Sequence, residues 1–241
     1  KNIGKGDIII ADVLMDIGNI YTQMVYLEKS IEYFNEALLI YIEKLGASSA
    51  HVSRVYNNIG VAYYKKGDYD AAELFYTKSL MIDLDLLGED HLDIAVSYHN
   101  LGLIFRKIKN YDRALHYYSK ALGIREKQPN ANSRACSDSY SSIANLYDDL
   151  GQYEKSIEYH EKSIAILRSI YGEKHPFVAQ EYNNLVNPYL KKKNYEKAIG
   201  MCQKSLAALG YADGADFLNT GYIYELNTSF YLLSKINLER Y

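Results

Sequence analysis

A repeat of 42 residues constrains the fold more than any other feature of this 241-residue chain. Five similar segments align without a gap, and they begin at Leu14, Tyr56, Tyr98, Tyr140 and Tyr182. A series of small, turn-forming residues keeps the same spacing: Gly4, Gly46, Gly88, Asn130, Gly172 and Gly214. A period of this length predicts an array of similar supersecondary units that stack on one another and bury a shared core.

Each repeat unit is expected to form two helices. In the second unit, Tyr56, Ile59 and Tyr63 recur at the spacing of one helical face, and the stretch from Tyr69 to Leu80 shows the same spacing again. No part of the chain shows the sustained polar and apolar alternation that is typical of a strand. The fold class that we predict is therefore all-α, a right-handed α-solenoid of stacked antiparallel helix pairs.

Local chemistry marks the predicted helix ends. Residues with N-cap side chains precede the expected helices: Asp7, Ser49, Asp68, Asn110, Ser133 and Asn194. The in-phase glycines are expected to end the second helices in the left-handed conformation, which Asn130 would also tolerate. Pro188 falls inside the first helix of the fifth unit, where its missing N–H is expected to kink the helix.

We expect residues 1–241 to form a single array that is a fragment of a longer one. Gly4 is in phase with the helix-ending glycines, so the residues before it are interpreted as the end of a preceding helix. The expected repeats occupy about residues 7–46, 49–88, 91–130, 133–172 and 175–214, with a partial sixth at 215–241.

The repeat also carries a recognisable motif. In the second unit it consists of Tyr56, Ile59, Gly60 and Tyr63, followed by Ala72, Tyr76 and Ser79. This pattern resembles the tetratricopeptide repeat (TPR) family, and the 42-residue unit is similar to the kinesin-light-chain subclass. Val186 and Cys202 depart from the pattern, because they replace a small residue and an aromatic residue. The resemblance covers nearly the whole chain and implies a module for protein interaction, since function resides in sites that a fold carries.

Composition disfavours several other classes of protein. The formal charge of −3, from 27 Lys and Arg against 30 Asp and Glu, gives no reason to expect nucleic acid as a partner. The longest apolar runs fall far short of the roughly 20 residues of a membrane-spanning helix, so no membrane partner is expected. Two cysteines exclude a disulfide scaffold and suit a reducing compartment, so we expect a cytoplasmic protein.

No motif indicates catalysis. Six histidines and two cysteines form neither a CxxC motif nor a helical His pair, so no metal or cofactor is expected. Neighbouring carboxylates on a helix diverge, and we interpret three such pairs as parts of solvated faces: Asp83/Asp85, Glu89/Asp90 and Asp148/Asp149. The chain is therefore not expected to be an enzyme.

The resemblance implies that the first helix of each unit lines a concave groove. We select these residues as candidates for binding a peptide there: Asn19, Arg54, Asn57, Tyr64, Lys65, His99, Arg106, Lys107, Asp138, Asn145, Asp148, Asn183, Asn187 and Lys191. An asparagine side chain both donates and accepts hydrogen bonds, so it can pair with the backbone of an extended peptide. The candidates of the second and third units are basic, and those of the fourth are acidic, which would select among peptides.

The hypothesis from sequence is a non-catalytic scaffold or adaptor that binds a protein or an extended peptide in its groove. The alternative is a regulatory or sensing array of a larger enzyme or ATPase, whose effector domain lies outside these residues. Binding of an oligosaccharide or a nucleic acid is a third possibility that the charge of the chain does not favour.

Overall fold

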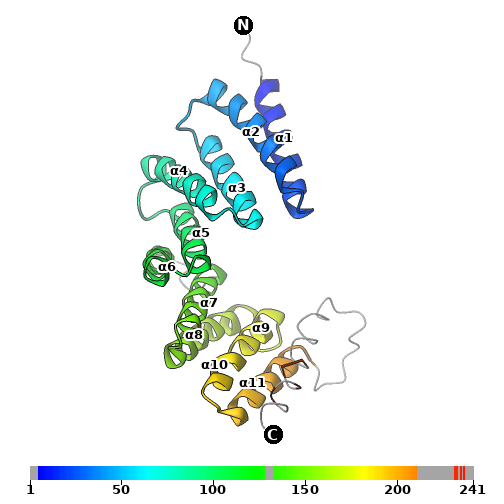
Figure 1. Ribbon diagram of the computed structural model, residues 1–241, viewed down its shortest axis with the longest axis vertical. Coiled ribbons are helices and arrows are strands. Elements are labelled where there is room, and N and C mark those ends of the chain that lie inside the picture. Colours follow the sequence, from blue (N-terminus) through cyan, green and yellow to red (C-terminus); the bar gives the residue numbers. More distant parts are fainter. Residues whose placement is uncertain (1–4, 129–132, 211–230, 233, 235, 237–241) are drawn as a thin grey trace. The chain divides into compact units, whose positions relative to one another are not determined.

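The computed structural model describes residues 5–128 and 133–210, and four positions near the C-terminus (231, 232, 234 and 236). This part of the chain is all-helical and holds no strand (Figure 1). Its helices are α1 (Lys5–Gln23), α2 (Leu27–Leu45), α3 (Ala50–Lys66), α4 (Tyr69–Leu87), α5 (Leu92–Lys107), α6 (Tyr111–Glu126), α7 (Arg134–Asp149), α8 (Tyr153–Tyr171), α9 (Pro176–Asn184), α10 (Val186–Lys191) and α11 (Tyr195–Ala208). The fold is the α-solenoid type that the repeat predicts. The partial sixth repeat lies almost entirely outside the described residues.

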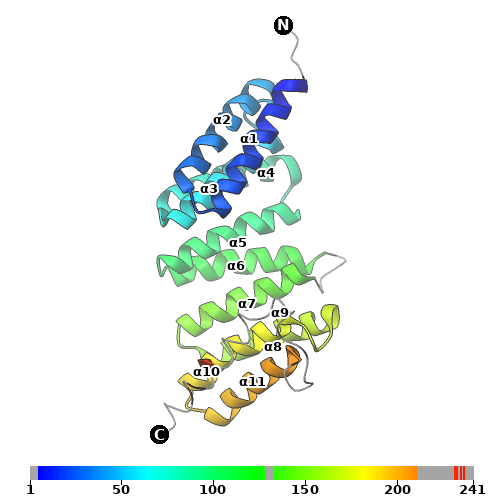
Figure 2. The same cartoon turned by 90° about the vertical axis from the view of Figure 1, so that its right-hand side faces the viewer.

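The chain divides into two compact units, Lys1–Ile124 and Arg125–Tyr241. In the first unit α1 pairs with α2 and α3 with α4, while α2 also packs against α3 and α4 against α5. In the second unit α7 pairs with α8, and α11 packs against both α9 and α10 (Figure 2). Each unit is therefore a stack of antiparallel helix pairs, as expected when one pair cannot bury its apolar face alone.

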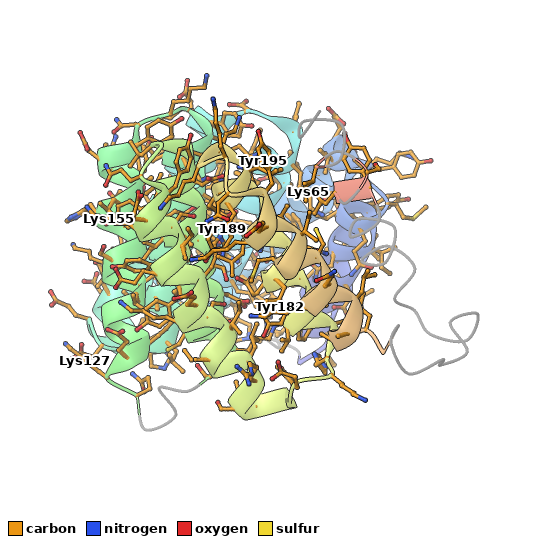
Figure 3. The ribbon with its side chains drawn as sticks, turned by 90° about the horizontal axis from the view of Figure 1, so that it is seen from below. Lys65, Lys127, Lys155, Tyr182, Tyr189 and Tyr195 are labelled. Atoms are coloured by element: carbon orange, nitrogen blue, oxygen red, sulfur yellow. The ribbon has the colours of Figure 1, made fainter. Side chains whose placement is uncertain are left out.

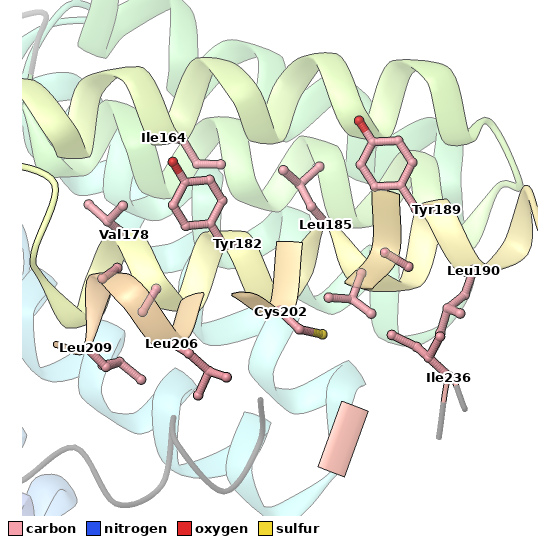
Figure 4. Packing of buried hydrophobic residues seen from close by; sticks show 14 of the residues in the cluster. Ile164, Val178, Tyr182, Leu185, Tyr189, Leu190, Cys202, Leu206, Leu209 and Ile236 are labelled. Atoms are coloured by element: carbon pink, nitrogen blue, oxygen red, sulfur yellow. The ribbon is translucent and has the colours of Figure 1, made fainter. Parts of the chain in front are cut away.

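Each unit has its own apolar core. In the first unit, Phe34 and Tyr41 of α2 are fully buried beside Val52, Val55 and Ile59 of α3. In the second unit, a cluster formed mainly by α8 to α11 includes the residues labelled in Figure 4: Ile164, Val178, Tyr182, Leu185, Tyr189, Leu190, Cys202, Leu206, Leu209 and Ile236. Tyr182 and Tyr189, seen from below in Figure 3, are 5% and 8% exposed. These tyrosines pack in the core, which agrees with their place in the repeat motif.

A size match holds the two helices of each pair together. A Cβ atom added at Gly18 would lie 2.5 Å from the Phe34 ring, and one added at Gly60 would lie 2.7 Å from the Tyr76 ring. The same 16-residue spacing joins Gly102 to Tyr118, Ala144 to His160, and Val186 to Cys202. Over the last three pairs the first-helix side chain grows from glycine to alanine to valine, while its partner shrinks from tyrosine to histidine to cysteine. The departures from the motif at Val186 and Cys202 are complementary changes at one packing position.

The described N-caps largely follow the prediction. Main-chain N–H groups donate to the side chains of these residues: Ser49, Asp68, Asn110, Ser133 and Asn194. His91 and His175 cap α5 and α9 in the same way, through Nδ1 atoms 3.2 Å from a main-chain nitrogen. The prediction for Asp7 is wrong, because α1 begins at Lys5 and Asp7 lies inside it.

The in-phase glycines need a correction to their expected conformation. Gly46, Gly88 and Gly172 have φ between 80° and 86°, but their ψ angles of 157°, 166° and 178° are far from those of a left-handed helix. This region is essentially restricted to glycine, because a Cβ atom would collide with the backbone. The other three members of the series, Gly4, Asn130 and Gly214, lie outside the described residues.

The left-handed conformation occurs instead at the turn within each helix pair. Five residues spaced by 42 have positive φ there: Val25 (64°), Gly67 (85°), Lys109 (61°), Gly151 (71°) and Lys193 (56°). Three of these residues carry a side chain, which is why the series is not visible as a run of glycines. Val25 is the most unfavourable member, since β-branched residues rarely adopt positive φ.

The first helix of the fifth repeat is interrupted, as Pro188 predicts. α9 ends at Asn184 and α10 begins at Val186, with Leu185 between them. Among the described first helices, α1, α3, α5 and α7 run without such a break. Proline removes one hydrogen bond and crowds the preceding turn, which accounts for the interruption.

Candidate functional site

The candidate residues lie on α1, α3 and α5 in the first unit and on α7, α9 and α10 in the second. Their side chains fall into three classes of exposure. The exposed ones are Arg54, Lys65, Lys107, Asp138 and Lys191. The half-buried ones are Asn19, Asn57, Tyr64, His99, Arg106, Asn145, Asp148 and Asn187. Asn183 is 9% exposed, so its amide is mostly enclosed by the protein and has little surface to offer a peptide.

The asparagines of the first unit pair with one another across neighbouring helices. Asn58 Nδ2 donates to Asn19 Oδ1 at 3.0 Å, and Asn100 Nδ2 donates to Asn57 Oδ1 at 3.1 Å. Sequence reasoning missed Asn58 and Asn100, although each is the direct neighbour of a candidate position. The pairing fixes the amide orientation of Asn57, whose Nδ2 makes no hydrogen bond to any described residue. A half-buried, oriented amide donor is what an extended peptide backbone requires.

Two basic candidates of the first unit, Arg54 and Lys65, already contact acceptor groups of the protein. Arg54 Nη2 lies 3.4 Å from Asp12 Oδ1, and the Tyr41 hydroxyl donates to the same oxygen at 2.5 Å. Lys65 Nζ donates to the Thr22 carbonyl at 3.3 Å. The Arg54–Asp12 ion pair is solvent-exposed and therefore weak, about 0–1 kcal/mol. These side chains remain free to exchange their partners for an acidic ligand.

The two acidic candidates of the second unit differ in their surroundings, because Asp148 is half-buried and Asp138 is exposed. Asn187 Nδ2 donates to Asp148 Oδ2 at 2.5 Å, while Asp148 Oδ1 is buried without a partner among the described residues. Burial raises the pKa of Asp148, and the hydrogen bond from Asn187 partly offsets this. Partial desolvation also raises the pKa of Asp138, whose Oδ2 lies 3.8 Å from Arg134 Nε. Both carboxylates would be stabilised by a cationic ligand.

A pocket of about 380 Å³ opens in the first unit between α3, α4 and α5. The candidates Arg54 and Asn57 line it, together with Ser53, Ser79 and Ser97. Asp83 of α4 also lines it and is only 9% exposed, so the interpretation of Asp83 as part of a solvated face is wrong. Burial raises the pKa of the Asp83 carboxyl above its ordinary value, and the nearby Ser53 and Ser79 hydroxyls partly offset this.

A pocket of about 240 Å³ occupies the equivalent place in the second unit, two repeats further along the chain. The positions of Ala50, Arg54 and Asn57 are taken there by Arg134, Asp138 and Ser141. The position of Ser97 is taken by Glu181, whose Oε2 lies 2.9 Å from Nδ1 of the buried His160. Half-buried Asn145 lines this pocket and makes no hydrogen bond to any described residue.

Both pockets show that second helices contribute to the candidate surface, which sequence reasoning assigned to first helices alone. The position of Asp83 recurs as Tyr41, Arg125, Leu167 and Leu209 in the other repeats. The sequence does hold one indication of this role for Asp83, because two other repeats have leucine at its position. A carboxylate at a position that is apolar in those repeats is unusual, since buried charges are rare unless they are paired.

The scan against protein families agrees with the helix pairs and the motif. The model of the tetratricopeptide repeat matches residues 9–85, 82–127 and 134–209. The chain belongs to the tetratricopeptide repeat family. Such repeats are interaction scaffolds that bind proteins or peptides, and the family is typically non-catalytic.

Several solved structures share the fold of this TPR chain at low sequence identity. BtubC (BKLC) from P. vanneervenii has a TM-score of 0.76 and 20% identity over 87% of this chain and 84% of that one. The kinesin light chain TPR-like repeats of Podospora anserina give 0.72 and 16%, over 85% and 97%. A signal-transduction ATPase (STAND) protein with a TPR sensor, from Pyrococcus horikoshii, gives 0.69 and 20%, over 97% of this chain and 36% of that one.

No curated protein sequence matches the chain. Within the described residues, no three or more His, Cys, Asp or Glu side chains come together in a way that could hold a metal ion. None of the described helices is both long enough and apolar enough to cross a membrane.

Proposed function

We propose that this TPR chain is a non-catalytic scaffold or adaptor that binds an extended peptide or protein segment along its first helices. The observation that carries the proposal is the oriented amide of Asn57 beside a pocket, with the amide of Asn145 lining the equivalent pocket of the second unit. Two such amides suit the backbone of a peptide whatever its sequence, because each can donate and accept.

The charged candidate residues suggest which partner residues each unit prefers. Lys65, Arg106 and Lys107 lie near the C-terminal ends of α3 and α5, whereas Asp138 and Asp148 lie on α7. We expect the first unit to favour acidic residues of the partner at these helix ends, and α7 to favour basic ones. Ion pairs at an exposed surface add little affinity, so this charge pattern acts mainly on specificity and on the rate of association.

The experiment is capture of partners by the chain, followed by binding measurements with the partner that is retained. Asn57→Ala, Asn145→Ala and Arg106→Glu should each weaken its binding. The matched control is Asn35→Ala, on the outer side of α2, where the side chain is exposed. The proposal fails if the three variants bind as the unchanged chain does while a substitution on an outer second helix, such as Glu73→Ala, abolishes binding.

A second candidate function is a sensing array that controls an attached ATPase. The structural likeness to a STAND protein with a TPR sensor favours it, because this chain aligns over almost its whole length with part of that larger protein. A nucleotide-binding domain encoded beside these residues, with ATP hydrolysis that changes when the TPR partner binds, would support this alternative. Unchanged hydrolysis on partner binding would oppose it.

A further inference from the structure

The pocket of the first unit is open because its walls carry short side chains. At the position of Asp83 the neighbouring repeats have longer residues, Tyr41 and Arg125. At the position of Ala50 the equivalent pocket has Arg134. Aspartate and alanine leave about 380 Å³ unfilled between α3, α4 and α5, enough for the end of a long side chain.

The carboxylate on the wall of this pocket lacks a counter-charge. Asp83 is 9% exposed, and the hydroxyls of Ser53 and Ser79, which line the pocket with it, favour its charged form. None of the described cationic side chains forms an ion pair with it, and Arg54 is engaged by Asp12 instead. Burying a charge without a partner is costly, so a cation entering the pocket would relieve the desolvation of Asp83.

Arg125 occupies the position of Asp83 in the next repeat, and its contacts show how a guanidinium can be bound there. Arg125 is 7% exposed, and its Nη1 donates to the Ala135 carbonyl at 3.1 Å and to the Ser139 hydroxyl. The residues equivalent to Ala135 and Ser139 in the first unit are Asp93 and Ser97, and both line the open pocket. The acceptors that hold Arg125 therefore have counterparts beside Asp83.

We propose that the pocket formed by α3, α4 and α5 binds the guanidinium of an arginine side chain that projects from the bound partner. The Asp83 carboxylate pairs with the guanidinium, and the Ser97 hydroxyl and Asp93 provide further acceptors. Arginine suits the site better than lysine because its planar fork can donate to a carboxylate and to a second acceptor at once. This inference rests on the proposed function for its biological ligand, but the pocket can be tested by itself.

The equivalent pocket of the second unit is smaller, about 240 Å³, and two of its charged side chains are already engaged by the chain. The Arg134 guanidinium lies 3.6 Å from the centre of the Phe177 ring, and Glu181 is already paired with His160. We therefore assign the arginine site to the first unit alone. The same comparison supplies a blocking variant, since Ala50→Arg would place a guanidinium at the position of Arg134.

The experiment is a titration of the ¹⁵N-labelled chain with N-acetyl-arginine amide, followed by amide chemical shifts. N-acetyl-citrulline amide is the control probe, because citrulline has nearly the same shape without the charge. We expect saturable shifts in α3, α4 and α5, with an affinity for arginine that is about fivefold or more above that for citrulline. Asp83→Asn should reduce arginine binding to the citrulline level, and Ala50→Arg should abolish the shifts.

The matched control variant is Asp85→Asn, which removes an exposed carboxylate two residues away and should bind arginine as the unchanged chain does. The ¹⁵N spectrum of each variant reports whether it is folded. The inference is overturned if citrulline binds as tightly as arginine, if no saturable shift occurs, or if Asp83→Asn and Asp85→Asn behave alike.

The outcomes also separate this inference from the proposed function. Asn145→Ala and Arg106→Glu change residues outside the pocket. If they weaken partner capture while the arginine probe gives no saturable shift, the pocket inference falls and the proposed function stands. The opposite outcome is that arginine binding requires Asp83, while Asn145→Ala and Arg106→Glu capture the partner normally and Glu73→Ala fails to capture it. The pocket inference would then hold, and the proposal that the partner binds along the first helices would be wrong.

Discussion

Single residues in this TPR chain adopt backbone conformations that their side chains do not favour. The turns within the helix pairs repeat a positive φ every 42 residues, yet Val25, Lys109 and Lys193 hold it without glycine. Gly67 at the equivalent position has open space around its Cα, so packing does not exclude a side chain there. A side chain at these positions therefore lowers the stability of the fold through backbone strain at positive φ, and not through a steric clash with neighbouring residues.

Val25→Gly should therefore stabilise the first unit. A β-branched residue at positive φ costs about 1–3 kcal/mol, so removing it should stabilise the folded state by that amount. Glycine also makes the unfolded chain more flexible, which lowers the stability by about 0.4–1 kcal/mol. We expect the free energy of unfolding in urea to rise by about 1 kcal/mol. The reverse change, Gly67→Val, should lower it, and a loss of stability in Val25→Gly would contradict the argument.

The two classes of glycine should respond differently to asparagine. Gly67 has φ 85° and ψ 6°, a region that asparagine tolerates, whereas Gly88 has ψ 166°, where nearly every non-glycine residue is strained. Gly67→Asn is expected to cost well under 1 kcal/mol, and Gly88→Asn about 1–3 kcal/mol. Thermal unfolding of the two variants side by side checks the difference, and equal costs would remove its basis.

Asp83 should give the first unit a recognisable dependence on pH. Because burial raises its pKa in the folded chain, the folded state binds more protons than the unfolded state between the two pKa values. The stability of the unchanged chain relative to Asp83→Asn should therefore increase as the pH falls from neutral towards about 4. The charged groups that affect the pKa of Asp83 are Asp93, which raises it, and His91, which lowers it.

The measurement is denaturant unfolding at several pH values. Asp138 and Asp148 also have raised pKa values, so only the difference between the two chains reports Asp83. Asp85→Asn supplies the control, since its carboxylate is exposed and should show no such difference. A difference that is constant with pH would show that Asp83 titrates normally.

At the scale of helix pairs, the fit between the two helices decides which substitutions are tolerated. Gly60→Ala should destabilise by about 1–3 kcal/mol, because the new methyl group meets the Tyr76 ring. Adding Tyr76→His should recover part of the loss, as the fourth repeat already combines Ala144 with His160. A double-mutant cycle measures this coupling, and strictly additive effects would show that the two positions do not interact.

Much of the helix organisation could be predicted from sequence. The spacing of apolar residues gave the two helices of each unit, and Ser49, Asp68 and Asn194 marked three of their starts. The interruption before Pro188 followed from the chemistry of proline. Asp7 misled the prediction because a good N-cap side chain does not prevent a helix from starting earlier.

The candidate site could be predicted less well, because its details depend on contacts between repeats. The pairing of Asn58 with Asn19 joins side chains 39 residues apart in sequence, and the 9% exposure of Asn183 likewise depends on packing that the repeat pattern does not specify. The burial of Asp83 depends on how α4 packs against α3 and α5. A periodic pattern indicates which face a residue occupies, but it does not indicate how deeply the next helix covers that face.

At the scale of the whole molecule, two compact units predict localised effects of mutation. In an array whose contacts join neighbouring repeats, a destabilised pair should open without opening a distant one. Gly60→Ala should therefore speed amide hydrogen exchange in α3 and α4, with little change in α9 and α11. Equal acceleration in all four helices would show that the chain unfolds as a single cooperative body.

The matched packing positions also bear on how genes for such arrays change length. A crossover between two copies of the repeat preserves the 42-residue phase and adds or removes a whole hairpin. A crossover between the two helix-coding halves joins helices from different repeats and can place Val186 opposite Tyr76. Such a recombinant would keep its reading frame and its helices, yet it would carry a steric clash in the middle of a hairpin. Duplication of these repeats should therefore leave its boundaries in the turns between hairpins.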